Sequence, residues 1–259
     1  MDRKAIFITG GASGIGRAIA QRFAKEGWFV GLGDVNEKGM VETQHLIGLG
    51  FSFGHTFDVR DRDAWDEALN AFSMASGGRI DVVFNNAGIP LGGSLLENSA
   101  EEIERCLDIN LKGVLFGAQA AHPFLKKTAP GSCLLNTASA AGIYGTPGAS
   151  VYSATKFGVR AITESLDGEW VEYGIKVRSI MPGFIETPLI DQVPNGQTNE
   201  AIRDRVKVQS FGTPGGMGPR PGPQGRRDPR GRGDVIDGDF HEIPEQPRQT
   251  KGPSGWTKD

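Results

Sequence analysis

The 259-residue sequence is poor in the features that mark several large classes of protein. Its first apolar run, Ala5–Thr9, is too short for a membrane span or for the apolar region of a signal peptide. The two cysteines and four histidines show no metal-ligand spacing. The net charge of −3 gives no electrostatic reason for binding nucleic acid or a membrane. We therefore expect a cytoplasmic protein with reduced thiols, no metal, and no nucleic-acid or membrane partner.

Short apolar runs alternate with longer segments of helical periodicity. The runs predict strands at 5–9, 29–33, 53–57, 80–84, 132–137 and 176–180, and helical patterns lie at about 15–23, 36–48, 62–75, 100–128 and 150–173. Strands separated by crossover helices predict an α/β fold, a doubly wound parallel sheet with helices on both faces, Rossmann-like in type. Ligands of such sheets bind beyond the carboxyl ends of the strands. No pattern indicates a further strand after 176–180, so the sequence does not decide whether the sheet has another edge strand.

The composition changes abruptly near Phe211. Between Gly212 and Asp259, 19 of 48 residues are glycine or proline, and no helical or strand period survives. We therefore predict one folded domain over 1–211 and a disordered Gly/Pro/Arg-rich tail over 212–259. A cationic tail that binds nucleic acid is one alternative, although nearby acidic residues offset its arginines. Another hypothesis is a frameshifted segment, because glycine, proline and arginine are what GC-rich codons give when they are read out of frame.

A glycine-rich segment, Thr9 to Gly16, follows the first predicted strand and opens the first predicted helix. Glycines allow the backbone to turn tightly and to approach a pyrophosphate, and the helix N-terminus supplies free N–H groups. We interpret the segment as a phosphate-binding turn. The alternative is a tight turn without a ligand.

Two acidic residues follow predicted strands. Asp34 lies 18 residues after Gly16, where a carboxylate accepts hydrogen bonds from the ribose diol of NAD(H) and repels the 2′-phosphate of NADP(H). Neither Val35 nor Asn36 offers a cation for that phosphate, so the sequence favours NAD(H). The alternative is that Asp34 or Asn36 caps the next helix. Asp58, which also follows a predicted strand, has two interpretations of its own: it caps the next helix, or it contacts the adenine of the cofactor.

A third set of candidate functional residues comprises Ser139, Tyr152 and Lys156. Tyr152 and Lys156 are four residues apart and therefore share one face of the predicted helix. An ammonium beside a phenol lowers the pKa of tyrosine from about 10 towards neutrality, which suits a general acid/base. Ser139 follows the fifth predicted strand and offers a hydroxyl to a substrate carbonyl. A chance surface pair of tyrosine and lysine is the alternative.

Taken together, these motifs resemble the short-chain dehydrogenase/reductase family over about residues 4 to 190. TGGASGIG is similar to the family's glycine-rich pattern, NNAG at 85–88 to its post-strand motif, and Tyr152 with Lys156 to its YxxxK. Asn110 stands where the family carries the asparagine of its Asn-Ser-Tyr-Lys tetrad. On this resemblance the predicted cofactor site comprises Gly10, Ser13, Gly14, Ile15, Gly16, Asp34, Asp58, Val59, Asn86, Ala87, Gly88, Tyr152, Lys156, Pro182, Gly183, Ile185 and Thr187.

The resemblance implies a hydride transfer between NAD(H) and a secondary alcohol or ketone, carried out by the dinucleotide-binding and catalytic domain 1–211. Tyr152 would exchange the proton of the substrate oxygen, Ser139 would hold that oxygen, Lys156 would hold the nicotinamide ribose, and Asn110 would anchor a water of a proton relay. A pocket formed by 89–96, 140–149 and 184–191 implies a neutral, largely apolar substrate. A homo-oligomer, dimer or tetramer, is also implied. The alternatives are an NADP(H)-dependent ketone reductase and a non-catalytic nucleotide-binding scaffold.

Overall fold

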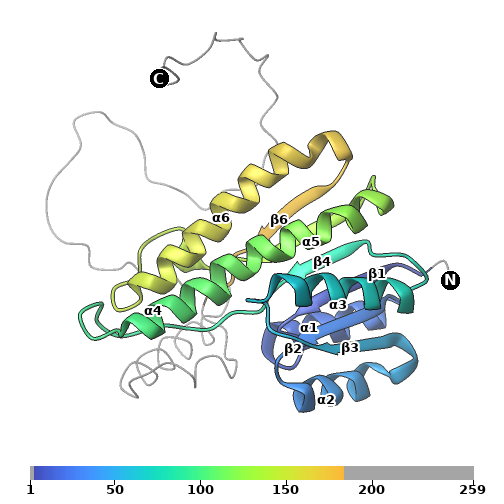
Figure 1. Cartoon of the computed structure of the whole chain (residues 1–259), viewed down its shortest axis with the longest axis horizontal. Helices are drawn as coiled ribbons and strands as arrows, with labels where there is room; N and C mark the ends of the chain where they lie inside the picture. The colour runs from blue at the N-terminus through green and yellow to red at the C-terminus, as the bar shows by residue number, and fades with distance from the viewer. Residues whose placement is uncertain (1–2, 184–259) are drawn as a thin grey trace, which may run out of the picture. The chain divides into compact units, whose positions relative to one another are not determined.

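A computed structural model of the chain describes residues 3–183. Six parallel strands form one sheet in the order β3-β2-β1-β4-β5-β6 (Figure 1). Their bounds are β1 Ala5–Thr9, β2 Phe29–Asp34, β3 Ser52–Thr56, β4 Val82–Asn85, β5 Cys133–Thr137 and β6 Lys176–Ile180. The first strand, β1, lies in the middle of the sheet. β2 and β3 extend the sheet on one side of β1, and β4, β5 and β6 extend it on the other. This order is that of a doubly wound, Rossmann-like sheet, as predicted.

The central strand β1 is buried along its whole length because both faces of the sheet are covered there. Ala5 and Phe7 point into one apolar core, whereas Ile6 and Ile8 point into the other. Phe7 packs against Phe72 with ring centroids 5.3 Å apart. The alternation of a strand with period two thus divides a single apolar run between two cores.

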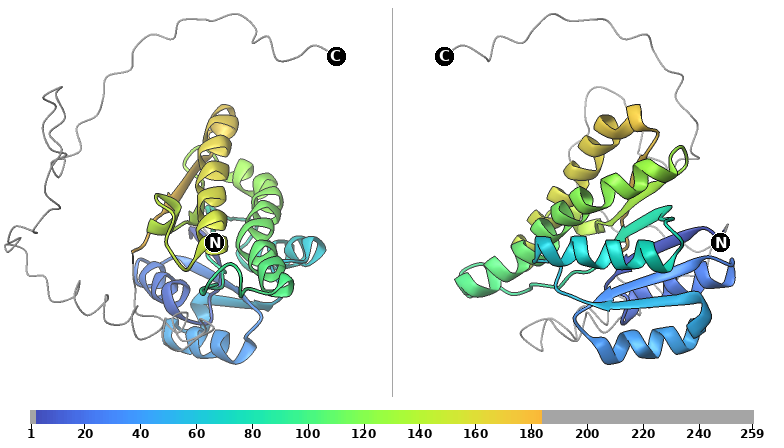
Figure 2. Two further views of the ribbon diagram at one scale, coloured as in Figure 1. Left: turned by 90° about the vertical axis from the view of Figure 1, so that its left-hand side faces the viewer. Right: turned by 45° about the vertical axis from the view of Figure 1, so that its right-hand side comes forward.

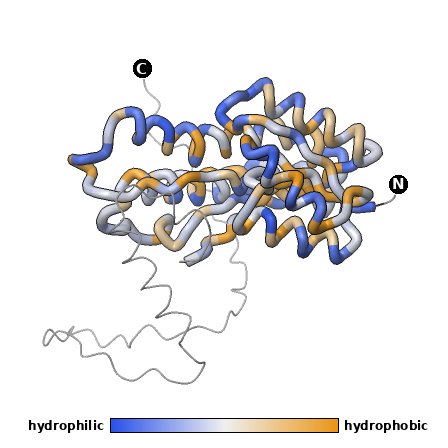
Figure 3. Tube along the Cα trace, turned by 90° about the horizontal axis from the view of Figure 1, so that it is seen from below, coloured by the Kyte–Doolittle hydropathy of each residue, from blue (hydrophilic) through white to orange (hydrophobic). Residues whose placement is uncertain are grey.

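Helices from the two halves of the chain cover the faces of the sheet (Figures 1 and 2). The core beside Ile6 receives α1 (Gly14–Lys25) and α2 (Glu37–Ile47). The core beside Phe7 receives α3 (Arg62–Ala75), α5 (Gly113–Thr128) and the end of α6 (Ser150–Trp170). The helices alternate between hydrophilic and hydrophobic stretches, as amphipathic helices do (Figure 3).

Side chains define where several helices begin. Asn36 caps α2 by accepting from the Gly39 N–H, and Asp61 caps α3 by accepting from the N–H groups of Asp63 and Ala64. Ser99 and Glu102 form a capping box at the start of α4, Ala100–Leu107. Short 3₁₀ turns occupy Leu49–Phe51, Ala140–Gly142 and Val171–Tyr173.

The helical segment predicted over 100–128 is confirmed in its bounds, but it is not one regular α-helix. The chain widens into a π-helical turn at Asp108–Lys112 between α4 and α5. Such turns insert one residue into a helix and are frequent at functional sites. Here the turn contains Asn110, whose amide group bonds the backbone of the distant loop at Ile89. Boundaries elsewhere move by a residue or two; the fourth strand, for example, begins at Val82 rather than at residue 80.

Within residues 3–183 the sheet ends at β6, which pairs with β5 alone. The question of a further strand and the predicted tail over 212–259 lie outside the described residues. No helix in the described part of the chain is long and apolar enough to cross a membrane.

Candidate active site

A cleft of about 590 Å³ lies at the carboxyl ends of the strands. The turns after β1, β2, β3, β4 and β5 all contribute to its walls, as expected for a parallel sheet. The predicted site residues that line it are Gly10, Ser13, Gly14, Ile15, Asp34, Asp58, Asn86, Ala87, Gly88, Ser139, Tyr152, Lys156, Pro182 and Gly183. Ile185 and Thr187 lie outside the described residues. Segments as far apart in the sequence as Gly10 and Gly183 thus meet at one opening.

The glycine-rich turn after β1 has no room for a side chain at Gly10, Gly11 or Gly16. Gly10 and Gly14 adopt positive φ angles of 68° and 53°. A Cβ at Gly16 would lie 2.1 Å from the Gly10 carbonyl oxygen, so Gly16 is buried behind the turn rather than in the cleft wall. Helix α1 begins at Gly14, and no side chain caps its first N–H groups. This close, uncapped helix start fits the pyrophosphate of a dinucleotide.

Asparagine and threonine side chains join three strand ends behind this turn. The Thr9 hydroxyl accepts from the N–H groups of Asn86 and Ala87 at 3.0 and 3.1 Å. The Asn86 amide donates to the Thr9 carbonyl at 3.0 Å and accepts from the Thr137 hydroxyl at 3.1 Å. The Asn-Asn-Ala-Gly segment therefore braces the floor of the cleft, beyond the simple turn that its sequence alone indicates.

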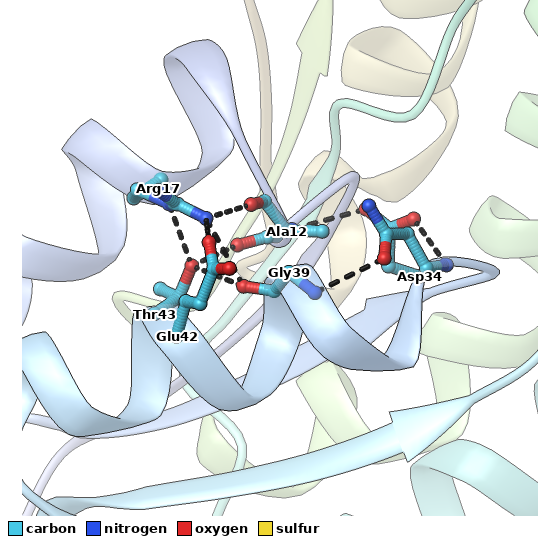
Figure 4. Close-up of polar contacts among 8 residues, drawn as sticks. Ala12, Arg17, Asp34, Gly39, Glu42 and Thr43 are labelled. Atoms are coloured by element: carbon cyan, nitrogen blue, oxygen red, sulfur yellow. Dashed lines mark hydrogen bonds and ion pairs between the residues drawn. The ribbon is translucent and has the colours of Figure 1, made fainter.

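Asp34 contacts the glycine-rich turn directly (Figure 4) and lines the cleft. One carboxylate oxygen accepts from the Ala12 N–H at 3.0 Å and the other from the Asn36 N–H at 2.9 Å. The cap of α2 is Asn36 and not Asp34, so the helix-cap alternative holds for Asn36 alone. Neither N–H bond occupies all the acceptor capacity of the carboxylate, which fits an additional diol.

Asp58 contributes a second carboxylate to the cleft. It forms an ion pair with Arg60, with an N–O distance of 2.6 Å, and this partner holds the pKa of Asp58 below its usual value. The cap of the next helix is Asp61. The neighbouring Val59, predicted as a cofactor contact, lies outside the cleft wall: it is buried against Gly113, and its carbonyl accepts from the Trp65 indole at 3.1 Å.

Lys156 projects from the first turns of α6 into the cleft and is almost fully buried, with 4% of its surface exposed. Its ammonium donates to the Thr137 carbonyl at 2.9 Å. Because burial penalises the charged form, the pKa of Lys156 falls to about 8. A cation with a pKa near neutrality is suited to proton exchange as well as to hydrogen bonding.

Tyr152 lies one turn before Lys156, as predicted, but its pKa does not shift in the expected direction. Burial raises the pKa of the phenol, a hydrogen bond with Ser139 partly opposes that effect, and Lys156 makes no contribution. The Lys156 ammonium lies 5.5 Å from the centre of the tyrosine ring and is bonded to Thr137 instead. The expected lowering of the Tyr152 pKa by Lys156 is therefore wrong for the protein alone, because burial of the phenol has the largest effect on its pKa and only the Ser139 hydrogen bond opposes it.

Asn110 lies directly behind the cleft wall and is fully buried. Its amide accepts from the N–H of Ile89 and donates to the C=O of Ile89, each at 2.8 Å. A Cβ at Gly88 would lie 3.2 Å from the Asn110 oxygen and 3.7 Å from the Lys156 nitrogen. Asn110, Lys156 and the loop after β4 therefore converge, and Asn110 fixes that loop.

The protein-family model described as short chain dehydrogenase matches residues 4–198. The chain belongs to the short-chain dehydrogenase/reductase family. It is accordingly an oxidoreductase that acts on CH–OH groups. The predicted resemblance is thereby confirmed, and the match extends slightly beyond residue 190.

Characterised family members share about a third of their residues with this chain. The 3-oxoacyl-acyl-carrier-protein reductase FabG of Thermotoga maritima is 36% identical over 216 residues, 83% of this chain and 87% of that protein. The 2,5-dichloro-2,5-cyclohexadiene-1,4-diol dehydrogenase LinX of Sphingobium indicum is 38% identical over 194 residues, 74% of this chain and 76% of that protein. A family member from Burkholderia phymatum, solved in complex with NAD, aligns at 28% identity with a TM-score of 0.73 and covers 82% of this chain and 80% of its own.

Two charged residues of the cleft were not predicted from the sequence. Arg60 and Arg105 both line the cleft, although the sequence near Asp34 shows no arginine. Arg60 lies two residues after Asp58 and could have been found by the same position after a strand. Arg105 is on α4, remote in sequence from every motif, and no local pattern indicates it. Among the described residues, no group of three or more His, Cys, Asp or Glu side chains could hold a metal ion.

Proposed function

We propose that this protein transfers a hydride between NAD(H) and a neutral, largely apolar secondary alcohol or ketone, with Tyr152 as the general acid/base. The observation that carries the proposal is the shared cleft. Its walls contain an uncapped glycine-rich helix start, a carboxylate at the end of β2, and the Ser139, Tyr152 and Lys156 side chains. A hydride carrier and a proton donor are both needed for carbonyl reduction, and the cleft offers a place for each.

The residues proposed to hold the dinucleotide are the glycine-rich turn, Asp34, Asp58, the loop after β4, Lys156 and Pro182-Gly183. The turn and the start of α1 would bind the pyrophosphate through backbone N–H groups. Asp34 would accept from the adenosine ribose diol. When bound, the nicotinamide supplies or accepts the hydride. The protein supplies the position and the electrostatic environment of the reacting groups.

The proton is handled by this chain's own side chains. Tyr152 gives the proton to the substrate oxygen during reduction and takes it during oxidation. Ser139, which already bonds Tyr152, holds the same oxygen. Lys156, with a pKa of about 8, binds the nicotinamide ribose and returns the proton to the tyrosine. Asn110 secures the loop at Ile89 and with it the approach to Lys156, beside its predicted role of anchoring a water.

The choice of NAD(H) rests on Asp34, because its negative charge would meet the 2′-phosphate of NADP(H). Use of NADP(H) is the second candidate, and a specific observation favours it: Arg60 and Arg105 line the same cleft. Arg60 is already paired with Asp58 at 2.6 Å, which leaves it less free to bind a phosphate. A comparison of kcat/KM for the two cofactors, and of wild type with Asp34→Ala, separates the candidates.

The substrate proposal rests on the apolar cluster around the loop after β4. Leu91, Cys106 and Val151 are buried together, with Ile89 and Ile103 packed against them. The named relatives are a 3-oxoacyl-acyl-carrier-protein reductase and a 2,5-dichloro-2,5-cyclohexadiene-1,4-diol dehydrogenase, which supports a secondary alcohol or ketone group as the reacting centre. Exposed apolar side chains on α4, α5 and α6, namely Leu107, Leu115 and Phe157, support the proposed homo-oligomer. A cytoplasmic location and the absence of a nucleic-acid partner stay predictions.

The proposal is tested with Tyr152→Phe. We expect this variant to bind NADH with the affinity of the wild type in a fluorescence titration, and to lose turnover of a panel of neutral ketones by about 10²–10⁴-fold. Tyr173→Phe is the matched control, because Tyr173 lies beyond the far end of α6, about 30 Å along the helix axis. Near-native turnover by Tyr152→Phe overturns the assignment. NADH binding by the wild type without turnover of any ketone or alcohol favours the non-catalytic scaffold.

A further inference from the structure

Arg17 connects the glycine-rich turn to α2 (Figure 4). From α1 its guanidinium donates to the Ala12 carbonyl in the turn and to the Gly39 carbonyl at 3.2 Å in α2. The same side chain donates to the Thr43 hydroxyl at 2.9 Å and forms an ion pair with Glu42 at 3.1 Å. The Nε and Nη2 groups of Arg17 are therefore bonded to protein groups, and Arg17 does not line the cleft.

Thr43 completes this connection from α2. It is fully buried, and its hydroxyl lies 2.9 Å from the Gly11 carbonyl and 3.0 Å from the Gly39 carbonyl. The close approach of the two segments depends on Gly39, because a Cβ there would lie 2.9 Å from the Ala12 methyl. We call Arg17, Gly39, Glu42 and Thr43 the turn clamp. A buried set of bonds to carbonyls leaves costly unpaired groups when one member is removed.

The clamp holds the two peptide groups on either side of Ala12. The Gly11–Ala12 peptide, whose N–H bonds Asp34 at 3.0 Å, has its carbonyl 2.9 Å from the Thr43 hydroxyl, and Arg17 bonds the next carbonyl, that of Ala12. The other carboxylate oxygen is held by the Asn36 N–H, and the Asn36 side chain in turn bonds the Gly39 N–H. The orientation of the carboxylate thus depends on both sides of the clamp.

We infer that Arg17 is a positioning residue for cofactor selectivity: through Ala12 it holds the Asp34 carboxylate where it accepts a ribose diol and excludes a 2′-phosphate. The inference rests on the proposed use of NAD(H). In this role Arg17, although it is a cation beside the dinucleotide turn, does not bind the 2′-phosphate but helps to exclude it. Arg17 supports discrimination against the phosphorylated cofactor because its charge is taken up by Glu42 and three carbonyl or hydroxyl oxygens.

The test compares dissociation constants for NADH and NADPH, measured by fluorescence titration, in wild type, Arg17→Met, Arg17→Lys and Thr43→Val. We expect Arg17→Met to raise the dissociation constant for NADH about tenfold, equivalent to about 1.4 kcal/mol. The dissociation constant for NADPH should change much less. The ratio of the two constants, which measures the preference for NADH, should therefore move closer to one. Arg17→Lys keeps a donor for Ala12 and should retain part of the preference. Thr43→Val leaves all charges in place and should change selectivity in the same direction as Arg17→Met.

Arg22→Met is the matched control, because Arg22 lies on the same helix and pairs only with the exposed Glu26 among the contacts described. Its NADH preference should equal that of the wild type. A second measurement needs no cofactor: hydrogen exchange of the 10–16 segment should accelerate in Arg17→Met and not in Arg22→Met. A purely structural role for Arg17 lowers stability without narrowing the preference.

The outcomes separate this inference from the proposed function. Wild-type protein without a preference for NADH refutes the proposed cofactor. A wild-type preference for NADH that survives in Arg17→Met and Thr43→Val refutes only the role of Arg17. A larger loss for NADPH than for NADH in Arg17→Met also refutes it, because Arg17 would then bind the phosphate. If Arg17→Met does not fold, Arg17→Lys and Thr43→Val decide between these results.

Discussion

The buried ammonium of Lys156 makes the stability of this protein depend on pH in a way that can be worked out. Its pKa falls from 10.5 to about 8 on folding, because burial disfavours the charged form. The unfolded chain therefore holds more protons than the folded chain between these two values. The free energy of unfolding consequently rises with pH in this window, and the contribution is lost as the pH falls through 8.

The full shift of the Lys156 pKa on folding corresponds to about 3 kcal/mol in the free energy of unfolding. Between pH 7 and pH 9.5, Lys156 alone should contribute about 2 kcal/mol of this increase. The raised pKa values of the Cys106 and Cys133 thiols act in the opposite direction within the same range, so the lysine contribution is read from the difference between the wild type and a variant without Lys156. The measurement stops at about pH 9.5, because the raised pKa of Tyr152 acts in the opposite direction once that phenol begins to titrate in the unfolded chain.

Urea denaturation at a series of pH values measures this increase. Lys156→Met removes the titrating group, so the difference in unfolding free energy between wild type and variant should change by about 2 kcal/mol across the window. Lys25→Met, at an exposed position in the last turn of α1, is the matched control and should run parallel to the wild type. Parallel profiles for the wild type and Lys156→Met would show that the ammonium is not desolvated as its burial implies.

Two further substitutions test contacts that shape the cleft. Gly16→Ala places a methyl group 2.1 Å from the Gly10 carbonyl oxygen and should lower the free energy of unfolding by about 1–3 kcal/mol or more. Its control, Gly168→Ala, adds a methyl group in open space on α6 and should raise the free energy of unfolding by up to about 1 kcal/mol. Urea denaturation measures both changes, and a change of the same sign in the two variants would contradict the close packing at Gly16. Asn110→Ala leaves the N–H and C=O of Ile89 without their side-chain partner and should cost about 1–3 kcal/mol. Asn70→Ala, at an exposed position of α3, is its control, and equal stabilities would contradict the role of Asn110.

Much of the fold follows from local patterns. The six strands of residues 3–183 lie within two residues of their predicted positions, because each is a short apolar run bounded by polar or glycine-rich turns. The cleft lining was also largely predictable, since strand ends meet at one edge of a parallel sheet. Gly10, Asp34, Asn86 and Ser139 each follow a strand directly and therefore reach the cleft.

The remaining features depend on contacts between distant residues. The π-helical turn at Asp108–Lys112 interrupts a segment whose apolar spacing is continuous, and its asparagine pairs with Ile89, 21 positions away. Arg105 reaches the cleft only because α4 folds across it. The direction of the Tyr152 pKa shift depends on how deeply the phenol is buried and on a carbonyl that draws the Lys156 ammonium away. Sequence spacing alone carries none of this information.

Cofactor binding and proton transfer share one hydrogen-bonded framework in this cleft. Thr9, at the start of the glycine-rich turn, bonds Asn86; Asn86 accepts from the Thr137 hydroxyl; and the Thr137 carbonyl accepts from Lys156. A displacement of the turn therefore reaches the lysine through side chains and one peptide group, without passing through the helix that bears it. Because such interiors deform little, the position of Lys156, which is proposed to return the proton to Tyr152, depends on the same strand ends that hold the dinucleotide turn. Catalytic and binding defects should accordingly appear together in variants of this framework, and separately in variants of Tyr152, whose hydroxyl lies outside it.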